Sequence, residues 1–167
     1  METTKPILIL NAIEVRIIGV LIEKSKTTPD YYPMSINSIV NACNQKTSRN
    51  PVVNYDEETV TLSLNTLKIK GLVGTVTGAG TRSLKYKHNL AIVYPLLPAE
   101  VSILCLLFLR GPLTPGEINT YAARMYEFEN LEEVSGILNK LASDTPPYLT
   151  QLSRKPGKKE IRYMHLF

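Results

Sequence analysis

The sequence has few of the residues on which disulfides, metal sites and acid–base chemistry depend. Its 167 residues include only two cysteines, Cys43 and Cys105, and two histidines, His88 and His165. Both cysteines fall on apolar faces of expected helices, which indicates buried thiols in a reducing compartment. We therefore predict no disulfide, no metal site and no cofactor.

Long apolar runs are also missing. The run at 101–109 is far too short to span a bilayer, which takes about 20 residues. Residues 7–22 are interrupted by Asn11, Glu14 and Arg16, which is not typical of a signal peptide. We expect a soluble cytoplasmic protein without a membrane partner.

The net charge of +4 is unevenly distributed. Residues 1–95 hold 11 Lys and Arg against 7 Asp and Glu, whereas residues 96–167 hold 8 of each. Within the second part, residues 117–144 are acidic and residues 154–162 carry five bases and one acid. This positive bias permits nucleic-acid binding without requiring it.

The chain is internally duplicated, with a repeat of roughly 75 to 85 residues. The matching pairs are Glu14-Val15 with Glu100-Val101, Thr28-Pro29 with Thr114-Pro115, Ile36-Asn37-Ser38 with Ile118-Asn119-Thr120, and Lys85-Tyr86-Lys87-His88 with Arg162-Tyr163-Met164-His165. The offset falls from 86 to 82 and then to 77, so the first copy carries two insertions. We predict two small domains, 1–95 and 96–167, with inserted loops around 30–33 and 46–55 in the first.

Each copy has the pattern of three helices followed by a hairpin. In the first copy Asn11, Ser35 and Asp56 are expected N-caps, and Gly71 follows the third helix. The strands are expected at 72–76 and 84–88, around a turn containing Gly78-Ala79-Gly80. In the second copy we expect helices at 98–110, 115–124 and 131–143 and strands at 148–152 and 161–166.

This order predicts a mainly α fold with small β-hairpins, organised as tandem winged helix-turn-helix domains. Another small three-helix unit with a hairpin is the alternative. Asn37, Asn41 and Asn44 share one face of the second helix, where asparagine is unfavourable. We expect them to fix the inserted loops, or else to contact bases or phosphate.

Several stretches resemble the YceH-like family of bacterial proteins, whose function is poorly defined. The matching stretches are Leu21-Ile22-Glu23-Lys24, Thr28 to Pro33, Ala42 to Lys46, Arg49 to Val52, Gly71-Leu72-Val73, Gly78-Ala79-Gly80, Leu109 to Pro112, Thr114 to Glu117 and Arg162 to Leu166. The resemblance covers nearly the whole chain. It implies the tandem winged-helix fold and leaves the function to be argued from the residues.

A winged helix binds DNA with its third helix in the major groove and its wing on the phosphates. The candidate nucleic-acid-binding residues are Lys46, Arg49, Asn65, Lys68, Arg82, Lys85 and Lys87 in the first copy, and Arg154, Lys155, Lys158, Lys159 and Arg162 in the second. The first hypothesis is therefore a DNA-binding regulator, which would be nucleoid-associated. A solvated surface hairpin would explain the same cations.

Two features argue instead for a protein contact. Both third helices begin with acids, Glu57-Glu58 and Glu132-Glu133, which repel phosphate. In addition, Thr59, Leu62, Thr66 and Ile69 lie opposite the stripe expected to be buried. The second hypothesis is therefore that the protein is an adaptor or dimerising scaffold that does not bind DNA directly. Alternatively, the chain itself covers the third helix, which would explain the apolar stripe without a partner.

No pattern points to catalysis. The sequence has no nucleophile–base signature, no metal-ligand spacing and no evident small-molecule substrate site. The two histidines occupy equivalent positions, which duplication explains, so we expect structural imidazoles. We predict a protein that is not an enzyme.

Overall fold

The computed structural model describes residues 6–77, 84–157 and 159–167 and is mainly helical, with two antiparallel two-stranded sheets. The elements of the first half are α1 (Ala12–Thr27), the short 3-10 helix η1 (Pro29–Tyr31), α2 (Ile36–Cys43), α3 (Glu57–Ile69), β1 (Val73–Thr77) and β2 (Leu84–His88). After the short α4 (Leu90–Val93), the second half has α5 (Pro98–Arg110), α6 (Pro115–Tyr121), α7 (Leu131–Ser143), β3 (Leu149–Gln151) and β4 (Tyr163–His165). None of the described helices is long and apolar enough to cross a membrane.

The expected helix caps are present. The Asn11 side chain accepts a hydrogen bond from the Glu14 amide at 2.9 Å, and Ser35 and Asp56 cap α2 and α3 in the same way. Gly71 ends α3 at φ +80, and the Leu72 amide donates to the Leu67 carbonyl. Because Leu72 closes the helix, β1 begins one residue later than we predicted.

The repeated glutamate makes the same two contacts in each half, a hydrogen bond to a backbone amide and an ion pair. Glu14 and Glu100 are each about 1% exposed. Each accepts the amide three residues before it, from Asn11 at 3.0 Å and Leu97 at 2.8 Å. Each also pairs with a lysine at the third helix, Glu14 with Lys70 at the C-cap of α3 and Glu100 with Lys140 of α7. The duplicated glutamate thus joins the start of the first helix to the end of the third.

A further repeated contact adds a single residue to each hairpin. Met34, just before α2, forms an isolated antiparallel bridge with Tyr86 of β2. Leu113, just before α6, forms the equivalent bridge with Tyr163 of β4. Each half therefore runs helix, bridge residue, two helices and hairpin. The sequence pattern did not reveal these one-residue bridges.

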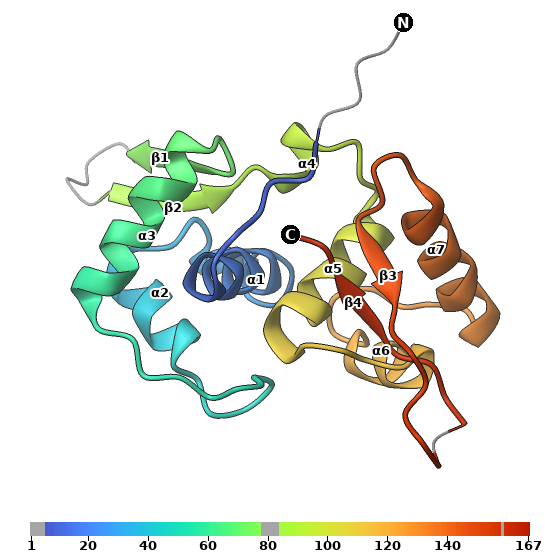
Figure 1. Cartoon of the computed structure of the whole chain (residues 1–167). Coiled ribbons are helices and arrows are strands. Elements are labelled where there is room, and N and C mark those ends of the chain that lie inside the picture. Colours follow the sequence, from blue (N-terminus) through green and yellow to red (C-terminus); the bar gives the residue numbers. More distant parts are fainter. Residues whose placement is uncertain (1–5, 78–83, 158) are drawn as a thin grey trace, which may run out of the picture.

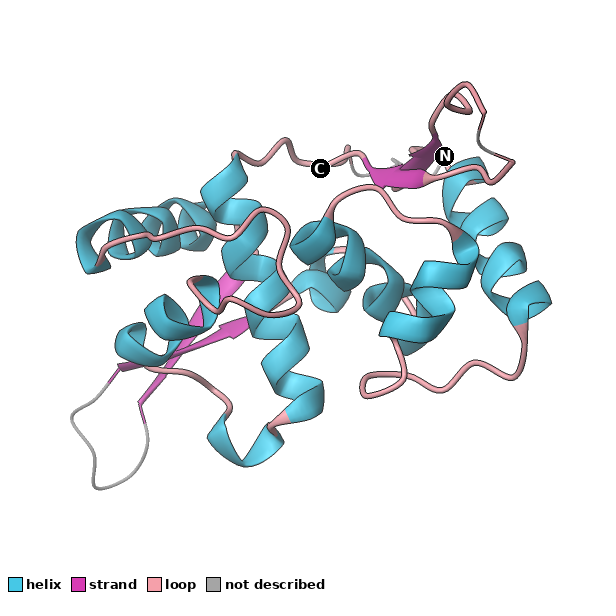
Figure 2. Cartoon of the chain, turned by 90° about the horizontal axis from the view of Figure 1, so that it is seen from below, coloured by secondary structure: helices cyan, strands magenta, loops and turns pink. Residues whose placement is uncertain are grey.

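The two halves meet along their first helices, α1 and α5, which lie side by side in the middle of Figure 1. Gly19 lets them approach closely, since a Cβ there would lie 2.8 Å from Leu109 Cδ2. The Cys105 thiol donates to the Gly19 carbonyl at 3.3 Å, and both cysteines are buried and free, as expected. Figure 2 shows the β1–β2 and β3–β4 hairpins on opposite sides of the molecule.

One helix prediction needs correction, and one helix was not predicted. We expected a helix at 115–124, but α6 ends at Tyr121 because the Ala122 carbonyl accepts the amides of Met125 and Tyr126 in a tight turn. The one-turn helix α4 was not predicted, since its apolar residues follow a strand without a capping side chain.

Candidate nucleic-acid interface

The outer face of α3 is open to solvent. Val60, Leu64 and Leu67 point into the core, each with 0% exposure. The helical period then directs Asn65 and Lys68 outward, where both are exposed. The second half packs on α1 rather than on α3, so nothing in the described chain covers these side chains.

The same face carries the predicted apolar stripe. Leu62 is 59% exposed and Ile69 is 87% exposed. Thr59 is half-buried beside them. Thr66 is exposed, but its hydroxyl donates to Glu14 at 2.7 Å, so it is tied to α1. Leu62 and Ile69 thus face solvent as predicted, and no described segment of the chain buries them.

The N-terminal turn of α3 is acidic. The Asp56 carboxylate accepts a hydrogen bond from the Thr59 amide, while Glu57 and Glu58 are exposed. These two carboxylates stabilise the helix N-terminus. They also repel phosphates, so only the C-terminal part of this face suits a polyanion.

The β1–β2 hairpin presents two lysines on one face. Lys85 pairs with Val76 and Lys87 with Gly74, whereas Tyr86 between them is buried. Both lysines are half-buried. Lysine can bury its stem and keep its ammonium group in water, so half-burial is compatible with phosphate contacts. Arg82, the third predicted hairpin cation, lies outside the described residues.

The loop before α3 carries two candidate phosphate-binding residues, Lys46 and Arg49, and only one of them is accessible. Lys46 is exposed, as expected. Arg49 is not available for DNA, because its side chain is 0% exposed and its guanidinium donates to both Glu23 oxygens, at 2.8 and 3.0 Å. Its Nε also donates to the Ala42 carbonyl. We therefore remove Arg49 from the phosphate-binding set and assign it to holding the loop.

Asn44 fixes the other end of this loop. Its side chain donates to the Tyr55 carbonyl and accepts from the Tyr55 amide, both at 2.8 Å. Asn37 and Asn41 are exposed instead. Loop fixing is thus confirmed for one asparagine of the three.

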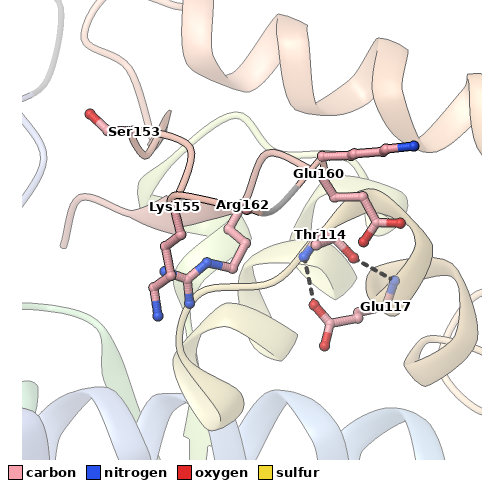
Figure 3. A pocket seen from close by; sticks show the side chains of 8 residues that line it. Thr114, Glu117, Ser153, Lys155, Glu160 and Arg162 are labelled. Atoms are coloured by element: carbon pink, nitrogen blue, oxygen red, sulfur yellow. Dashed lines mark hydrogen bonds between the residues drawn. The ribbon is translucent and has the colours of Figure 1, made fainter.

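The second hairpin lines a hollow of about 440 Å³. Figure 3 shows Lys155 and Arg162 lying side by side, with Glu117 and Glu160 across from them. Arg154, Lys155 and Lys159 are exposed and Arg162 is half-buried, while Lys158 lies outside the described residues. The two glutamates offset part of the positive charge that the sequence alone suggested for this turn.

The third helix of the second half is unsuited to a polyanion. Lys140 is the sole base of α7, and it pairs with Glu100 and Asp144. Glu132 and Glu133 stand in its first turn, with Glu129 just before. Of the two third helices, α3 is therefore the one with an exposed lysine, Lys68, that forms no ion pair among the described residues.

The histidines are structural. His88 Nδ1 accepts from the Leu90 amide and His165 Nδ1 from the Phe167 amide, at 3.4 and 3.2 Å. Burial lowers the pKa of each imidazole to about 4, with the Lys26 charge contributing at His88. In the described part of the chain, no cluster of His, Cys, Asp and Glu is suited to a metal ion.

The chain is similar in sequence to other bacterial proteins over nearly its whole length. Residues 10–158 match the family described as "Protein of unknown function, DUF480". The UPF0502 protein of Opitutus terrae is 46% identical, covering 97% of this chain and 71% of the relative. That of Citrifermentans bemidjiense is 48% identical, covering 95% and 73%, and the UPF0502 protein YceH of Escherichia fergusonii is 47% identical, covering 95% and 76%.

Proposed function

Because the chain belongs to the bacterial DUF480 family, whose description assigns no activity, we propose its function from its own geometry: it binds double-stranded DNA through its first half and is not an enzyme. The order of helix, bridge residue, two helices and hairpin, present twice, supports a tandem winged helix. In this fold α3 is the helix that enters the major groove.

The observation that carries the proposal is the open face of α3. Since α5 packs on α1, the second half leaves Asn65 and Lys68 accessible. Asparagine suits the edge of adenine, and an exposed apolar side chain such as Ile69 suits a thymine methyl group. Glu57 and Glu58 require the helix to approach through its C-terminal half, away from its acidic end.

The phosphate contacts come from cations around this helix. Lys46 precedes α3, Lys68 lies on it, and Lys85 and Lys87 share a face of the hairpin that follows. The second hairpin lies on the opposite side of the molecule (Figure 2), and its exposed bases Arg154, Lys155 and Lys159 are an additional contact region. Phosphate contacts supply affinity without sequence preference.

Replacing Lys85 and Lys87 together by alanine is expected to weaken binding to all duplexes by a similar factor. Each lysine accounts for about one released counterion, so the slope of log affinity against log salt falls by about 2. Fluorescence anisotropy with several labelled duplexes measures both quantities. The Arg110→Ala, Arg124→Ala double variant removes the same charge elsewhere and serves as the control. Wild-type affinity in the lysine variant would remove this hairpin from the interface.

A second function is favoured by a specific observation, the exposure of Leu62 and Ile69. They are seven residues apart, two turns along one face, as in helices that dock on a partner. On this alternative the chain is an adaptor or a dimerising scaffold, and α3 contacts protein rather than DNA.

We expect Leu62→Asp to disperse a self-assembly or partner complex if this alternative holds, while changing the free energy of unfolding by about 0.5 kcal/mol or less, because the residue is exposed. Light scattering reports the assembly, and urea unfolding reports the stability. Ile92→Asp, at another exposed apolar residue with 77% exposure, is the matched control. An assembly that persists in Leu62→Asp but not in the control would count against α3 as the contact.

A further inference from the structure

Arg16 is a buried cation with incomplete partners. It lies in α1 and is 4% exposed. Its Nη1 donates to the Cys43 carbonyl at 2.8 Å and its Nη2 to the Pro51 carbonyl. Its Nε has no hydrogen-bond partner among the described residues. A buried polar group left unpaired is costly, so its presence calls for an explanation.

The charge around Arg16 is unbalanced. No carboxylate of the described residues forms an ion pair with Arg16. The Glu23 carboxylate acts on Arg16 only through its charge, because its two oxygens accept from the terminal nitrogens of Arg49. Burial lowers the pKa of the Arg16 guanidinium, and the Arg49 charge lowers it further. Glu23 therefore neutralises Arg49, whereas the buried Arg16 guanidinium has no counter-ion among the described residues.

The fold itself does not need this charge. The duplication aligns Arg16 with Ser102, 86 residues later. Ser102 is 0% exposed at the equivalent place in α5, where its hydroxyl donates to the Pro98 carbonyl. The second half thus builds the same helix with a small neutral residue. The arginine is a specific feature of the first half.

Arg16 lines a cavity of about 470 Å³ between the two halves. This volume falls in the range of about 300–1,000 Å³ typical of small-molecule sites, which often lie between domains. Apolar walls come from α1, the inserted loop, α5 and the C-terminal strand: Val15, Val53, Phe108, Met164 and Phe167. The remaining polar lining is Asn50, Tyr55 and His165, and no acidic residue is among the lining residues.

We propose that this cavity binds a small hydrophobic carboxylate, whose anionic group pairs with Arg16 and whose apolar part packs on Phe108 and Met164. An apolar cavity with one desolvated guanidinium gives such a ligand both a charge-assisted hydrogen bond and apolar burial. A neutral ligand would leave the charge unpaired, and a strongly hydrated anion would gain little from the walls. The site is independent of DNA binding by α3.

Octanoate and phenylacetate are suitable probes, each compared with its neutral alcohol. Binding is followed by NMR chemical shifts, including the Met164 methyl group, in the full chain at low salt. We expect each carboxylate to bind at least about 10-fold more tightly than its alcohol, the value of one charged hydrogen bond. Equal affinity of acid and alcohol, or no binding of either carboxylate, would overturn the proposal.

Variants at Arg16 separate ligand binding from a purely structural role. Arg16→Gln keeps a donor for a loop carbonyl but removes the charge, and Arg16→Lys keeps the charge. We expect Arg16→Gln to lose carboxylate binding about 10-fold or more and Arg16→Lys to retain part of it. If Arg16 only tethers the loop, both variants will bind octanoate as the wild type does.

A variant at the cavity wall keeps the proposal testable if Arg16 variants do not fold. Ala12 lines the same cavity and is exposed, so a larger side chain there is tolerated by the fold. Ala12→Phe is expected to weaken octanoate binding by occupying space in the cavity, whereas Ala12→Ser leaves it unchanged. Undiminished binding in Ala12→Phe would place the ligand elsewhere and contradict the assignment.

Discussion

Replacing Gly19 by leucine is expected to lower the free energy of unfolding by about 3 kcal/mol. A Cβ at this position would lie 2.9 Å from Leu109 Cγ and 3.1 Å from Phe108 Cβ. Neither atom is at the free end of a side chain, so α1 and α5 must separate to admit the new group. The cost is that of overpacking at the contact that joins the two halves.

Gly136 offers a control of opposite sign. It lies in α7, and a Cβ there would meet nothing within 4 Å. Gly136→Ala should therefore raise the free energy of unfolding by about 0.5–1 kcal/mol, because alanine loses less backbone entropy in a helix. Urea unfolding followed by circular dichroism measures both variants. Wild-type stability in Gly19→Leu would contradict the close packing of α1 on α5.

Removal of the Glu23 carboxylate is the second change with a large expected effect. Glu23→Ala leaves the fully buried Arg49 guanidinium without its bidentate partner. Breaking a buried pair from one side typically costs 3–5 kcal/mol, and we expect about 3 kcal/mol because Glu23 is 13% exposed. The neighbouring Lys24→Ala should cost about 0.5 kcal/mol or less, since its pair with Glu23 is partly solvated.

The same pair predicts a pH dependence. Burial alone would raise the pKa of Glu23, but the hydrogen bonds and charge of Arg49 outweigh it, and the pKa lies below its ordinary value of 4.5. Its contribution to stability is therefore complete above about pH 4.5 and is lost as the pH falls through the lower folded value. Urea unfolding between neutral and acidic pH should show a shallower acid dependence in Glu23→Ala. An unchanged acid slope would mean that other carboxylates carry it.

Local signals in the sequence were sufficient for most helix boundaries. Asn11 and Asp56 act over three residues, so their capping roles follow from spacing alone. The outward face of α3 also followed from the position of Val60, Leu64 and Leu67 on one helical stripe. In these cases the interacting residues lie within one or two helical turns of each other, so the sequence shows them directly.

Arg49 could not be placed from its neighbours. It stands in a polar loop, which favours exposure, and its partner Glu23 lies 26 residues earlier on α1. Only the packing of the loop on α1 brings the two groups together. The same holds for Arg16, whose unbalanced charge depends on that distant pairing.

The side of α5 that packs against the first half could not be predicted for a different reason. All residues from Val101 to Leu109 are buried, so α5 has no polar stripe to indicate which side meets the first half. Gly19 was the available signal, but a glycine within a helix has several explanations. The cavity beside Arg16 is likewise formed by segments from both halves and has no local pattern.

The central claim, DNA binding through the first half, is tested most directly by fluorescence anisotropy of a labelled random duplex titrated at about 50 mM and about 200 mM salt. With Lys46, Lys68, Lys85 and Lys87 on phosphates, we predict micromolar or tighter binding at the lower salt and a loss of roughly 100-fold at the higher. No binding at the lower salt would contradict the claim and leave the exposed α3 face as a protein contact.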